Sequence, residues 1–247
     1  LGGSSNTFNI DGTGYASASA AGLDGGDITP DGASISTTAG VSIITYTGNG
    51  GANQTIEHGL SSDPQLTIIK DRDSNSSNNN WWFGSSIVGE KYGYFTNATW
   101  TGSTAIILPT SGDSTTVTIG RTGTNATNVL ESGDNFVMYN FTSIDGFSKV
   151  GSYVGNASTD GTFVYTGFRP AWIMLKEYDG SASYYIFDIA RDPENDGTST
   201  NLQANSTAVE GTSTPGLDIL SNGFKLRLTS GAVNGSADNY IYIAFAE

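Results

Sequence analysis

Hydrophobic and polar positions alternate along this chain in short runs, separated by loops rich in Gly, Ser, Thr, Asn and Asp. Alternation with a period of two is the pattern of a half-buried β-strand, and the runs are rich in the β-branched and aromatic residues that strands favour. The pattern therefore predicts an all-β protein with many short strands. We expect these strands at residues 41–46, 54–58, 66–70, 81–83, 92–100, 105–108, 115–119, 135–141, around Tyr153, and at 162–165, 171–176, 184–189, 217–220, 224–228 and 240–246.

Part of this pattern occurs twice in the chain, in the same order. The recurring segments are 45–49 (T-Y-T-G-N) with 152–156 (S-Y-V-G-N), 64–70 with 170–176, and 134–141 with 238–245. The repeat is longer than the about 20–50 residues of a solenoid unit, so it indicates two tandem domains. We place a first β-module at 41–144 and a second at 145–247.

The last strand expected in each repeat is apolar on both faces. Val137, Tyr139 and Phe141 share one face of 135–141, and Phe136 and Met138 lie on the other. A strand with two apolar faces lies centrally between two layers. Each module is therefore expected to resemble a β-sandwich.

Residues 1–40 are rich in Gly, Ser and Ala and have too few apolar residues for a core of their own. The segment is interpreted as an N-terminal arm or linker, or as a pair of edge strands. An ordered segment would pack on a neighbouring domain or subunit, and it could equally be the end of a preceding domain. The chain begins with Leu1, which suggests a processed product or a fragment of a longer protein.

Composition and charge narrow the function classes. The net charge is −14, and the ten Lys and Arg residues are scattered rather than clustered. Binding to nucleic acid needs clustered cations, so neither nucleic acid nor an anionic membrane surface is an expected partner. There is no cysteine, hence no disulfide framework. No run approaches the about 20 apolar residues of a membrane-spanning helix.

Residues for catalysis or metal binding are sparse. His58 is the only histidine; it precedes Gly59, and Thr166 stands at the matching place of the second repeat. With no G-x-S-x-G motif in its neighbourhood, a turn or surface role is favoured over a Ser-His-Asp triad. A histidine-based zinc site is excluded by count, and no cofactor is expected.

Acidic residues offer two further candidates. The runs Asp71–Asn75 and Asp192–Gly197 place oxygen side chains at alternating positions, but neither continues as a calcium loop does. Turn preference explains both runs more simply, so no metal site is assigned. Glycoside hydrolysis needs only two carboxylates, but the sequence does not pair the candidates, and no catalytic residue is assigned. These candidates are Glu57, Glu90, Glu131, Glu177, Asp188 and Asp192.

Aromatic residues are the only candidates for binding a ligand. Trp81, Trp82, Tyr92 and Tyr94 could stack on sugar rings. Neighbouring residues of a strand point to opposite faces, so at most one of Trp81 and Trp82 is exposed. The matching segment 184–187 (Y-Y-I-F) favours packing in the core.

The second repeat resembles a module of marine bacteriophage, cyanophage-type, tail fibre and other virion structural proteins. The residues that carry this resemblance are 145–161 (D-G-F-S-K-V-G-S-Y-V-G-N-A-S-T-D-G), 163–172, 187–192, 220–225 and 240–247. The first repeat matches more loosely, through 46–49, 58–60 and 134–136, and residues 1–40 have no counterpart. The resemblance brings no catalytic residues with it.

The resemblance implies a non-enzymatic component of a phage particle on the virion surface: a tail fibre, a tail-associated protein or a capsid fibre. The expected partners are other copies of the chain, as a trimer in a fibre, other virion proteins, and glycans of the host surface. Two alternatives stay open. One is a carbohydrate-binding or polysaccharide-degrading domain, and the other is a subunit of a secreted filament or surface layer with residues 1–40 docked on the next copy.

Overall fold

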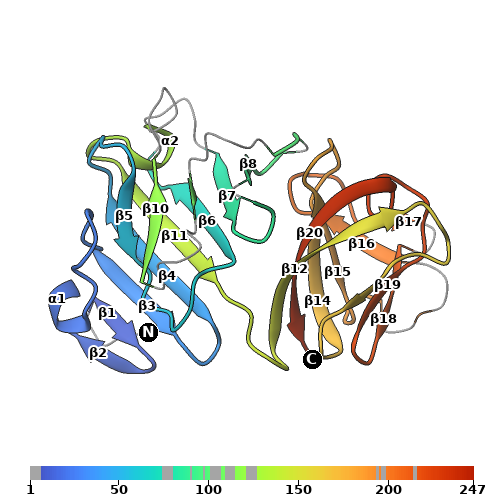
Figure 1. The fold of residues 1–247 in the computed structure, drawn as a ribbon, viewed down its shortest axis with the longest axis horizontal. Helices are drawn as coiled ribbons and strands as arrows, with labels where there is room; N and C mark the ends of the chain where they lie inside the picture. The colour runs from blue at the N-terminus through green and yellow to red at the C-terminus, as the bar shows by residue number, and fades with distance from the viewer. Residues whose placement is uncertain are drawn as a thin grey trace. The chain divides into compact units, whose positions relative to one another are not determined.

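A computed structural model shows a chain built almost entirely of β-strands (Figure 1). It divides into two compact units: unit 1 is Leu1–Tyr94 with Thr101–Thr142, and unit 2 is Phe95–Trp100 with Ser143–Glu247. The all-β class and the two related, sandwich-like modules are confirmed. The structure describes residues 7–73, 80–89, 91–96, 98–100, 107–108, 115–120, 127–192, 195, 199–213 and 216–247.

Unit 1 contains a large sheet and a small sheet, with the small one lying across the large one in Figure 1. Two helical turns, α1 (Ala18–Ala21) and α2 (Thr127–Leu130), accompany them. The large sheet has the order β2 (Thr13–Tyr15), β1 (Phe8–Ile10), β3 (Gly32–Ser36), β4 (Val41–Thr47), β11 (Asn135–Phe141), β6 (Leu66–Asp71), β7 (Trp81–Ser85), β8 (Lys91–Tyr94). The small sheet has the order β5 (Gln54–Glu57), β10 (Thr116–Ile119), β9 (Ile107–Leu108).

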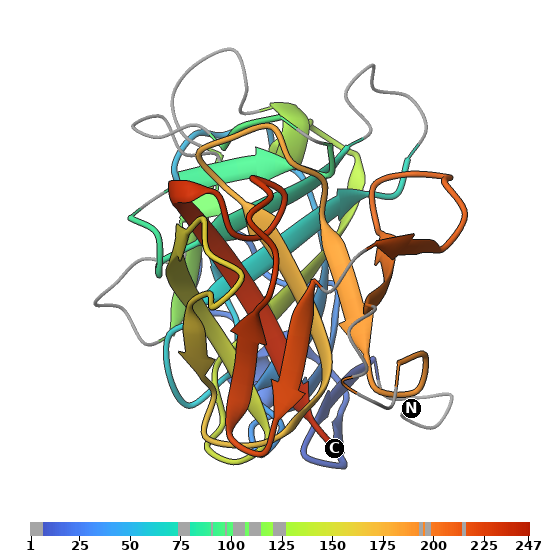
Figure 2. The ribbon, with the colours of Figure 1, turned by 90° about the vertical axis from the view of Figure 1, so that its right-hand side faces the viewer.

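Unit 2 repeats this plan with a shorter large sheet, and Figure 2 shows its small sheet in front of the large one. The large sheet has the order β12 (Ser148–Asn156), β20 (Ser236–Ala246), β14 (Pro170–Glu177), β15 (Tyr185–Asp188), β16 (Ser199–Gln203), β17 (Gly211–Ser213). The small sheet has the order β13 (Phe163–Tyr165), β19 (Gly223–Leu226), β18 (Leu217–Leu220).

The strand orders of the two units correspond over five strands of each large sheet and all three strands of each small sheet, whereas β1, β2 and β3 of unit 1 and β17 of unit 2 have no counterpart. The run β4-β11-β6-β7-β8 of unit 1 matches β12-β20-β14-β15-β16 of unit 2, and β5-β10-β9 matches β13-β19-β18. In both units the strand with two apolar faces, β11 or β20, lies inside the large sheet. Burial of both faces, as predicted, holds for 240–244 of β20 but not for β11, where Val137, Tyr139 and Phe141 are only partly buried. The repeat in the sequence therefore corresponds to a repeat of topology.

The two cores also share a pair of stacked aromatic rings. Tyr46 on β4 stacks on Phe136 of β11, with ring centroids 5.1 Å apart. Its hydroxyl group donates a hydrogen bond of 2.8 Å to the carbonyl oxygen of Val129. The hydroxyl group lies at the protein interior and needs such an acceptor, because a buried polar group without a partner is costly.

Unit 2 has the same arrangement. Tyr153 on β12 stacks on Tyr240 of β20 at 4.8 Å, and its hydroxyl group donates to the carbonyl oxygen of Val233 at 2.8 Å. Close approach of backbone explains why glycine recurs two residues after each of these tyrosines. A Cβ atom at Gly48 would lie 2.2 Å from the carbonyl oxygen of Glu131. At Gly155 it would lie 2.2 Å from that of Gly235.

The structure corrects the expected role of residues 1–40. Within this segment β3 pairs with β4, and β1 pairs with both β2 and β3, so these strands extend the large sheet of unit 1. Leu23, Ile28 and Ile35 are buried in the core of that unit. The segment is thus part of its own module. For the described residues 7–40, the interpretation as edge strands is therefore confirmed, and the interpretation as a separate arm or linker is wrong.

A second correction concerns the expected strand 92–100, of which only the first part is β8. The remainder belongs to unit 2: the backbone N–H of Trp100 donates to the carbonyl oxygen of Tyr178 at 2.8 Å. The indole N–H of Trp100 donates to the hydroxyl group of Tyr184 at 2.9 Å, and the ring of Phe95 lies 4.9 Å from that of Tyr184. Trp100 is buried, so its indole N–H needs this acceptor.

Strands 105–108 and 115–119 are described only at 107–108 and 116–119, with the rest of the former outside the described residues. Two short strands, β16 and β17, were not predicted because their runs are too polar or too short to show alternation. Edge strands were one interpretation of residues 1–40, but the sequence did not give the positions of β1, β2 and β3.

Candidate functional site

Trp81 and Trp82 lie side by side on β7 and point to opposite faces. Trp82 is 5% exposed and belongs to the core of unit 1, whereas Trp81 is 39% exposed. The ring of Trp81 stacks against that of Tyr139 on β11, with a centroid distance of 6.1 Å and an angle of 28°. Only Trp81 therefore offers a flat aromatic face to a ligand, in line with strand alternation.

The two tyrosines predicted to join this site lie on the other side of the sheet. Tyr92 is buried, with its ring 6.1 Å from that of Trp82. Tyr94 is partly buried, with its ring 5.4 Å from that of Trp82. The structure thus groups Trp82, Tyr92 and Tyr94 in the core, and it leaves Trp81 apart from them. Tyr139 was missed as the neighbour of Trp81, although alternation along 135–141 places it on a face with Val137 and Phe141.

His58 is fully buried in the turn that follows β5. Its Nδ1 atom accepts a hydrogen bond of 3.0 Å from the backbone N–H of Leu60. Gly59 has a φ of +67°, which a residue with a side chain rarely adopts. In unit 2 the turn repeats with Thr166, whose hydroxyl group donates to the carbonyl oxygen of Phe168 at 2.6 Å. His58 is therefore a turn residue, as the sequence favoured, but its side chain lies in the protein interior.

Asp73 closes a loop of unit 1. One of its carboxylate oxygens accepts from the backbone N–H of Asn135 at 2.7 Å and from the side-chain amide at 2.9 Å. These hydrogen bonds to Asn135 hold the pKa of Asp73 below its ordinary value. Asp179 accepts from the same two groups of Asn239, its backbone N–H and side-chain amide, with one carboxylate oxygen each, at 2.9 Å and 2.6 Å. The acidic run that begins at Asp71 therefore contains a structural clamp. The predicted calcium-like continuation at 74–75 lies outside the described residues.

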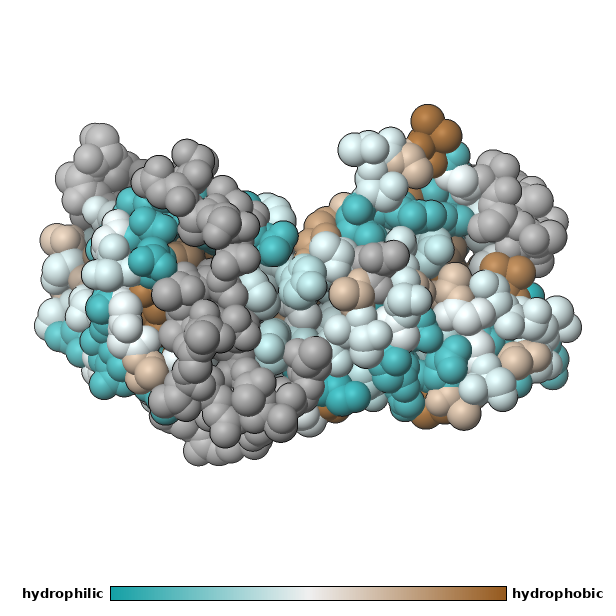
Figure 3. Space-filling view, turned by 90° about the horizontal axis from the view of Figure 1, so that it is seen from above, coloured by the Kyte–Doolittle hydropathy of each residue, from teal (hydrophilic) through white to brown (hydrophobic). Residues whose placement is uncertain are grey.

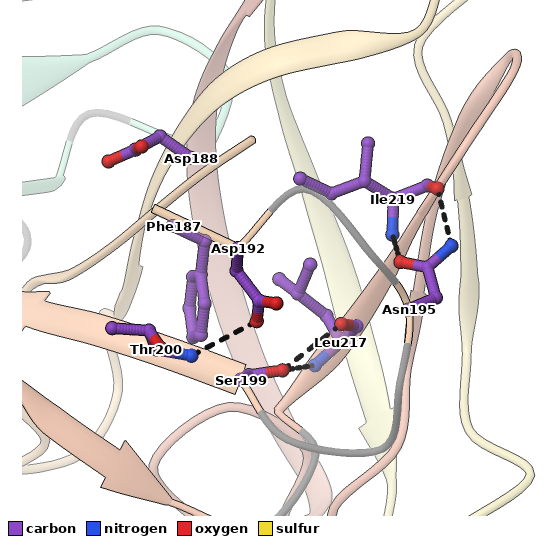
Figure 4. Close-up of a pocket in the computed structure, with 8 residues that line it drawn as sticks. All are labelled: Phe187, Asp188, Asp192, Asn195, Ser199, Thr200, Leu217 and Ile219. Atoms are coloured by element: carbon purple, nitrogen blue, oxygen red, sulfur yellow. Dashed lines mark hydrogen bonds between the residues drawn. The ribbon is translucent and has the colours of Figure 1, made fainter. Parts of the chain in front are cut away.

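The second acidic run lies beside a small pocket in unit 2, shown in Figure 4. Asp192 accepts from the backbone N–H of Thr200 at 3.1 Å. The amide group of Asn195 both donates to and accepts from the backbone of Ile219, at 2.9 Å each. The lining residues are Phe187, Asp188, Asp192, Asn195, Ser199, Thr200, Leu217 and Ile219.

The polar groups that line the pocket are engaged in hydrogen bonds or a salt bridge within unit 2. Asp188 lines it too, but Asp188 accepts from Arg191 at 2.8 Å in a salt bridge. The hydroxyl group of Ser199 accepts from the backbone N–H of Gly216 at 2.8 Å. Across the described ranges, no group of three His, Cys, Asp or Glu side chains could hold a metal ion. The pocket residues thus mainly hold loops in place.

Two of the remaining candidate carboxylates accept hydrogen bonds from backbone of their own unit. Glu57 accepts from the backbone N–H of Gly25 at 2.7 Å in unit 1. Glu177 accepts from the backbone N–H of Ala182 at 3.0 Å in unit 2, and burial raises the pKa of Glu177. Glu131 belongs to unit 1, and Glu90 lies outside the described residues. Asp188 and Asp192 are the only two candidates that the described part of the chain brings to one pocket.

Lys176 was not singled out from the sequence, yet it is only 1% exposed. Its ammonium group donates to the carbonyl oxygens of Glu177, Gly180 and Ala182, at 2.6, 3.2 and 2.7 Å. Burial lowers the pKa of Lys176 from 10.5 to about 8, against the opposing effect of the Glu177 charge. Enclosed by the loop that it ties together, this lysine acts as a structural residue.

The face of the molecule in Figure 3 is largely polar, with small apolar areas between polar ones. No helix in the described part of the chain is long and apolar enough to cross a bilayer. One family, described as a domain of unknown function (DUF7483), matches residues 5–247, and the chain belongs to it. No curated protein and no solved structure matches the chain.

Proposed function

We propose that this member of the DUF7483 family is a non-enzymatic structural component of a phage particle, displayed on the virion surface. The observation that carries the proposal is the duplication: two units of one strand order, with the same stacked aromatic pair and the same aspartate clamp. Repetition of a stable module extends a structure and multiplies its surfaces. The resemblance of residues 145–247 to marine phage virion modules supports the same role.

The chemistry of the polar residues also supports this role. The carboxylates at the pocket of unit 2, the buried lysine and the only histidine of the chain each hold a loop or turn. Groups that act on a substrate need free donors or acceptors directed at it. Here the same groups contribute to a rigid scaffold.

The proposal is tested on purified particles of the virus whose genome encodes the chain. Mass spectrometry should find the chain in a fixed ratio to the major capsid or tail protein, and gold-labelled antibodies against it should decorate intact particles. Absence from particles, together with abundance in the free lysate, would contradict the proposal.

A second candidate function is contact with a glycan, favoured by the exposed ring of Trp81 against Tyr139. A glycan array should then give binding that Trp81→Ala abolishes. The matched control is Thr13→Ala, which truncates an exposed side chain of the same unit on β2, at the far edge of the large sheet from β7. Trp82→Ala cannot serve, because removing a buried tryptophan costs about 3–5 kcal/mol of stability.

Cleavage of a polysaccharide would instead make the chain a degrading enzyme. An assay for released sugar distinguishes cleavage from binding. Loss of the released sugar with Asp188→Asn or Asp192→Asn would show that a carboxylate of this pocket is catalytic. A filament or surface-layer subunit predicts polymers of the purified chain in the absence of any virus.

A further inference from the structure

One rim of unit 2 carries exposed apolar side chains. It is formed by Val154 on β12 and by Phe163 and Tyr165 on β13, which are 52%, 44% and 64% exposed. We call these three residues the β13 rim. They are three of the seven large apolar side chains that are exposed within the described residues.

The same rim of unit 1 is polar. The corresponding residues follow from the strand pairing, because Tyr46 matches Tyr153, and the turn residue His58 matches Thr166. The positions of Val154, Phe163 and Tyr165 are therefore held in unit 1 by Thr47, Thr55 and Glu57.

The N-terminal segment covers this polar rim of unit 1. The backbone N–H of Ile28 donates to the carbonyl oxygen of Thr55 at 3.1 Å, and the backbone N–H of Thr55 donates to Asp27 at 3.0 Å. The backbone N–H of Gly25 donates to the carboxylate of Glu57 at 2.7 Å. The outer edge of β5 is thus occupied by peptide from the same chain.

Within the part of the chain that the structure describes, no strand pairs with the corresponding outer edge of β13. The N–H of Leu226 donates to the carbonyl oxygen of Thr162, and the N–H of Thr166 donates to that of Asn222, both at 3.0 Å. These hydrogen bonds show that the backbone groups of residues 162 and 166 point toward β19. Because this direction alternates along a strand, the N–H and C=O groups of Val164 point toward β19 as well. The N–H and C=O groups of Phe163 and Tyr165 therefore point away from β19. Within the described residues, β13 ends its sheet on that side.

We propose that this edge pairs with β13 of a second copy of the chain, in antiparallel orientation about a twofold axis at Val164. Phe163 would then face Tyr165 of the second copy, and Tyr165 would face its Phe163. Both residues carry outward backbone groups, so each of these pairs forms the two hydrogen bonds of an antiparallel ladder. The two small sheets join into one continuous sheet.

The register explains why the occupant is a second copy. An isologous contact needs a self-complementary strand, and the sequence F-V-Y pairs an aromatic residue with an aromatic residue on the same face. Cross-strand aromatic pairs stabilise a sheet. Natural edge strands are usually blocked by charges or proline, and β13 carries neither. The charges of Asp160 and Lys225 are paired with each other beside the strand.

The contact is small, so it is weak. A three-residue strand with Val154 buries much less than the about 1,600 Å² of a stable interface. We expect a dimer that forms with rising concentration. This inference names a surface for the assembly role proposed above and rests on that role. A fibre trimer would use a threefold axis, which makes it a separate interface.

Analytical ultracentrifugation of the full chain over about 5 to 500 μM is the first test. The weight-average mass should rise from 25.7 kDa toward twice that value. The double variant Phe163→Thr, Tyr165→Glu gives unit 2 the rim residues of unit 1, and it should raise the dissociation constant at least about tenfold. Val209→Thr, which changes a side chain of unit 2 with 90% exposure, is the matched control and should leave it unchanged.

A disulfide test fixes the register. The chain has no cysteine, so Val164→Cys introduces a single one. Residue 164 would face its own copy at a non-hydrogen-bonded position, with Cα atoms about 4.5 Å apart, a distance that a disulfide spans. Val164 is only 5% exposed in its own copy, so the matched control carries the same cysteine in the background of the double variant. Mild oxidation should link Val164→Cys at least about tenfold faster than this control.

Three results would overturn the inference: a monomer at every concentration, a dimer that the double variant leaves intact, or equal cross-linking of Val164→Cys with and without the double substitution. A glycan that binds the monomer and is lost in the double variant would assign the rim to a sugar instead. If the chain is found in virus particles but fails these tests, the β13 inference is wrong and the proposed function stands.

Discussion

Unit 1 and unit 2 share a matching run of strands and differ in the strands added at the edges of the large sheet and at the rim formed by β5 or β13. The run of matching strands and the stacked pairs, Tyr46 on Phe136 and Tyr153 on Tyr240, show that both cores have the same arrangement. At the rim, unit 1 is covered by residues 25–31, whereas unit 2 exposes Val154, Phe163 and Tyr165. A packed core tolerates few changes, but an exposed rim changes freely, and so the rim is where the two units can differ in function.

The largest effect expected in both units comes from the glycines that follow the stacked tyrosines. Gly48→Ala and Gly155→Ala should each lower the free energy of unfolding by about 3–5 kcal/mol, because the new Cβ atom meets backbone that cannot move aside. Chemical denaturation measures the loss, and hydrogen–deuterium exchange shows which unit opens. Gly211→Ala is the control and should change little, since its nearest atom would be 3.6 Å away. A loss in one unit alone would break the equivalence of the two cores.

Lysine provides the next largest effect and a contrast between the units. Lys176→Ala removes an ammonium group from three buried carbonyl oxygens, so it should cost about 3 kcal/mol. Lys70, its repeat partner, is half-buried and donates to the carbonyl oxygen of Asp71 at 2.8 Å. Lys70→Ala should cost less than Lys176→Ala, because the half-buried ammonium group of Lys70 is already partly solvated. Equal losses measured by denaturation would show that the two lysines are equivalent after all.

A smaller and equal effect is expected from the buried hydroxyl groups. Tyr46→Phe and Tyr153→Phe each leave one buried carbonyl oxygen without its donor, at a cost of about 1–2 kcal/mol. The two values should agree within about 0.5 kcal/mol, because the surroundings repeat. Tyr165→Phe, at an exposed position, should change stability by almost nothing. Losses that differ widely between the two tyrosines would limit the likeness to topology.

A further effect concerns pH. Lys176 has a pKa of about 8 in the folded chain, against an ordinary value of 10.5. Between these values the unfolded chain binds more protons, so the stability of the folded state rises with pH. Below about pH 8 this contribution is constant. Unfolding free energies at pH 7, 9 and 10 should show the rise in the wild type, and Lys176→Ala should reduce it. An unchanged slope would mean that another group titrates.

Most strands were predictable because their signal is local. The alternation in 41–46, 66–70 and 135–141 reappears as β4, β6 and β11, since the period of two directly reflects a sheet with one face in a core. The segment 7–36 was harder, because its strands are three to five residues long and gain stability only from pairing with β4. Trp100 was placed in the wrong module, because its partners Tyr178 and Tyr184 are distant in sequence.

The candidate site was predicted in part. Alternation correctly allows only one exposed tryptophan in the pair Trp81 and Trp82, but it does not say which one. Burial of Trp82 with Tyr92 follows from the position of the small sheet above β7 and β8. The structural roles of His58 and Asp73 come from hydrogen bonds that they accept from the backbone of Leu60 and of Asn135, respectively. These hydrogen bonds form only when the loops are in place.

By itself, the sequence determined the all-β class and the duplication of a sandwich-like module, because strand periodicity and repetition are properties of the chain alone. The tertiary structure decided which rim is covered, which aromatic residues are buried and to which unit residues 95–100 belong. These features arise from contacts between residues far apart in the chain, whose energies no local pattern encodes.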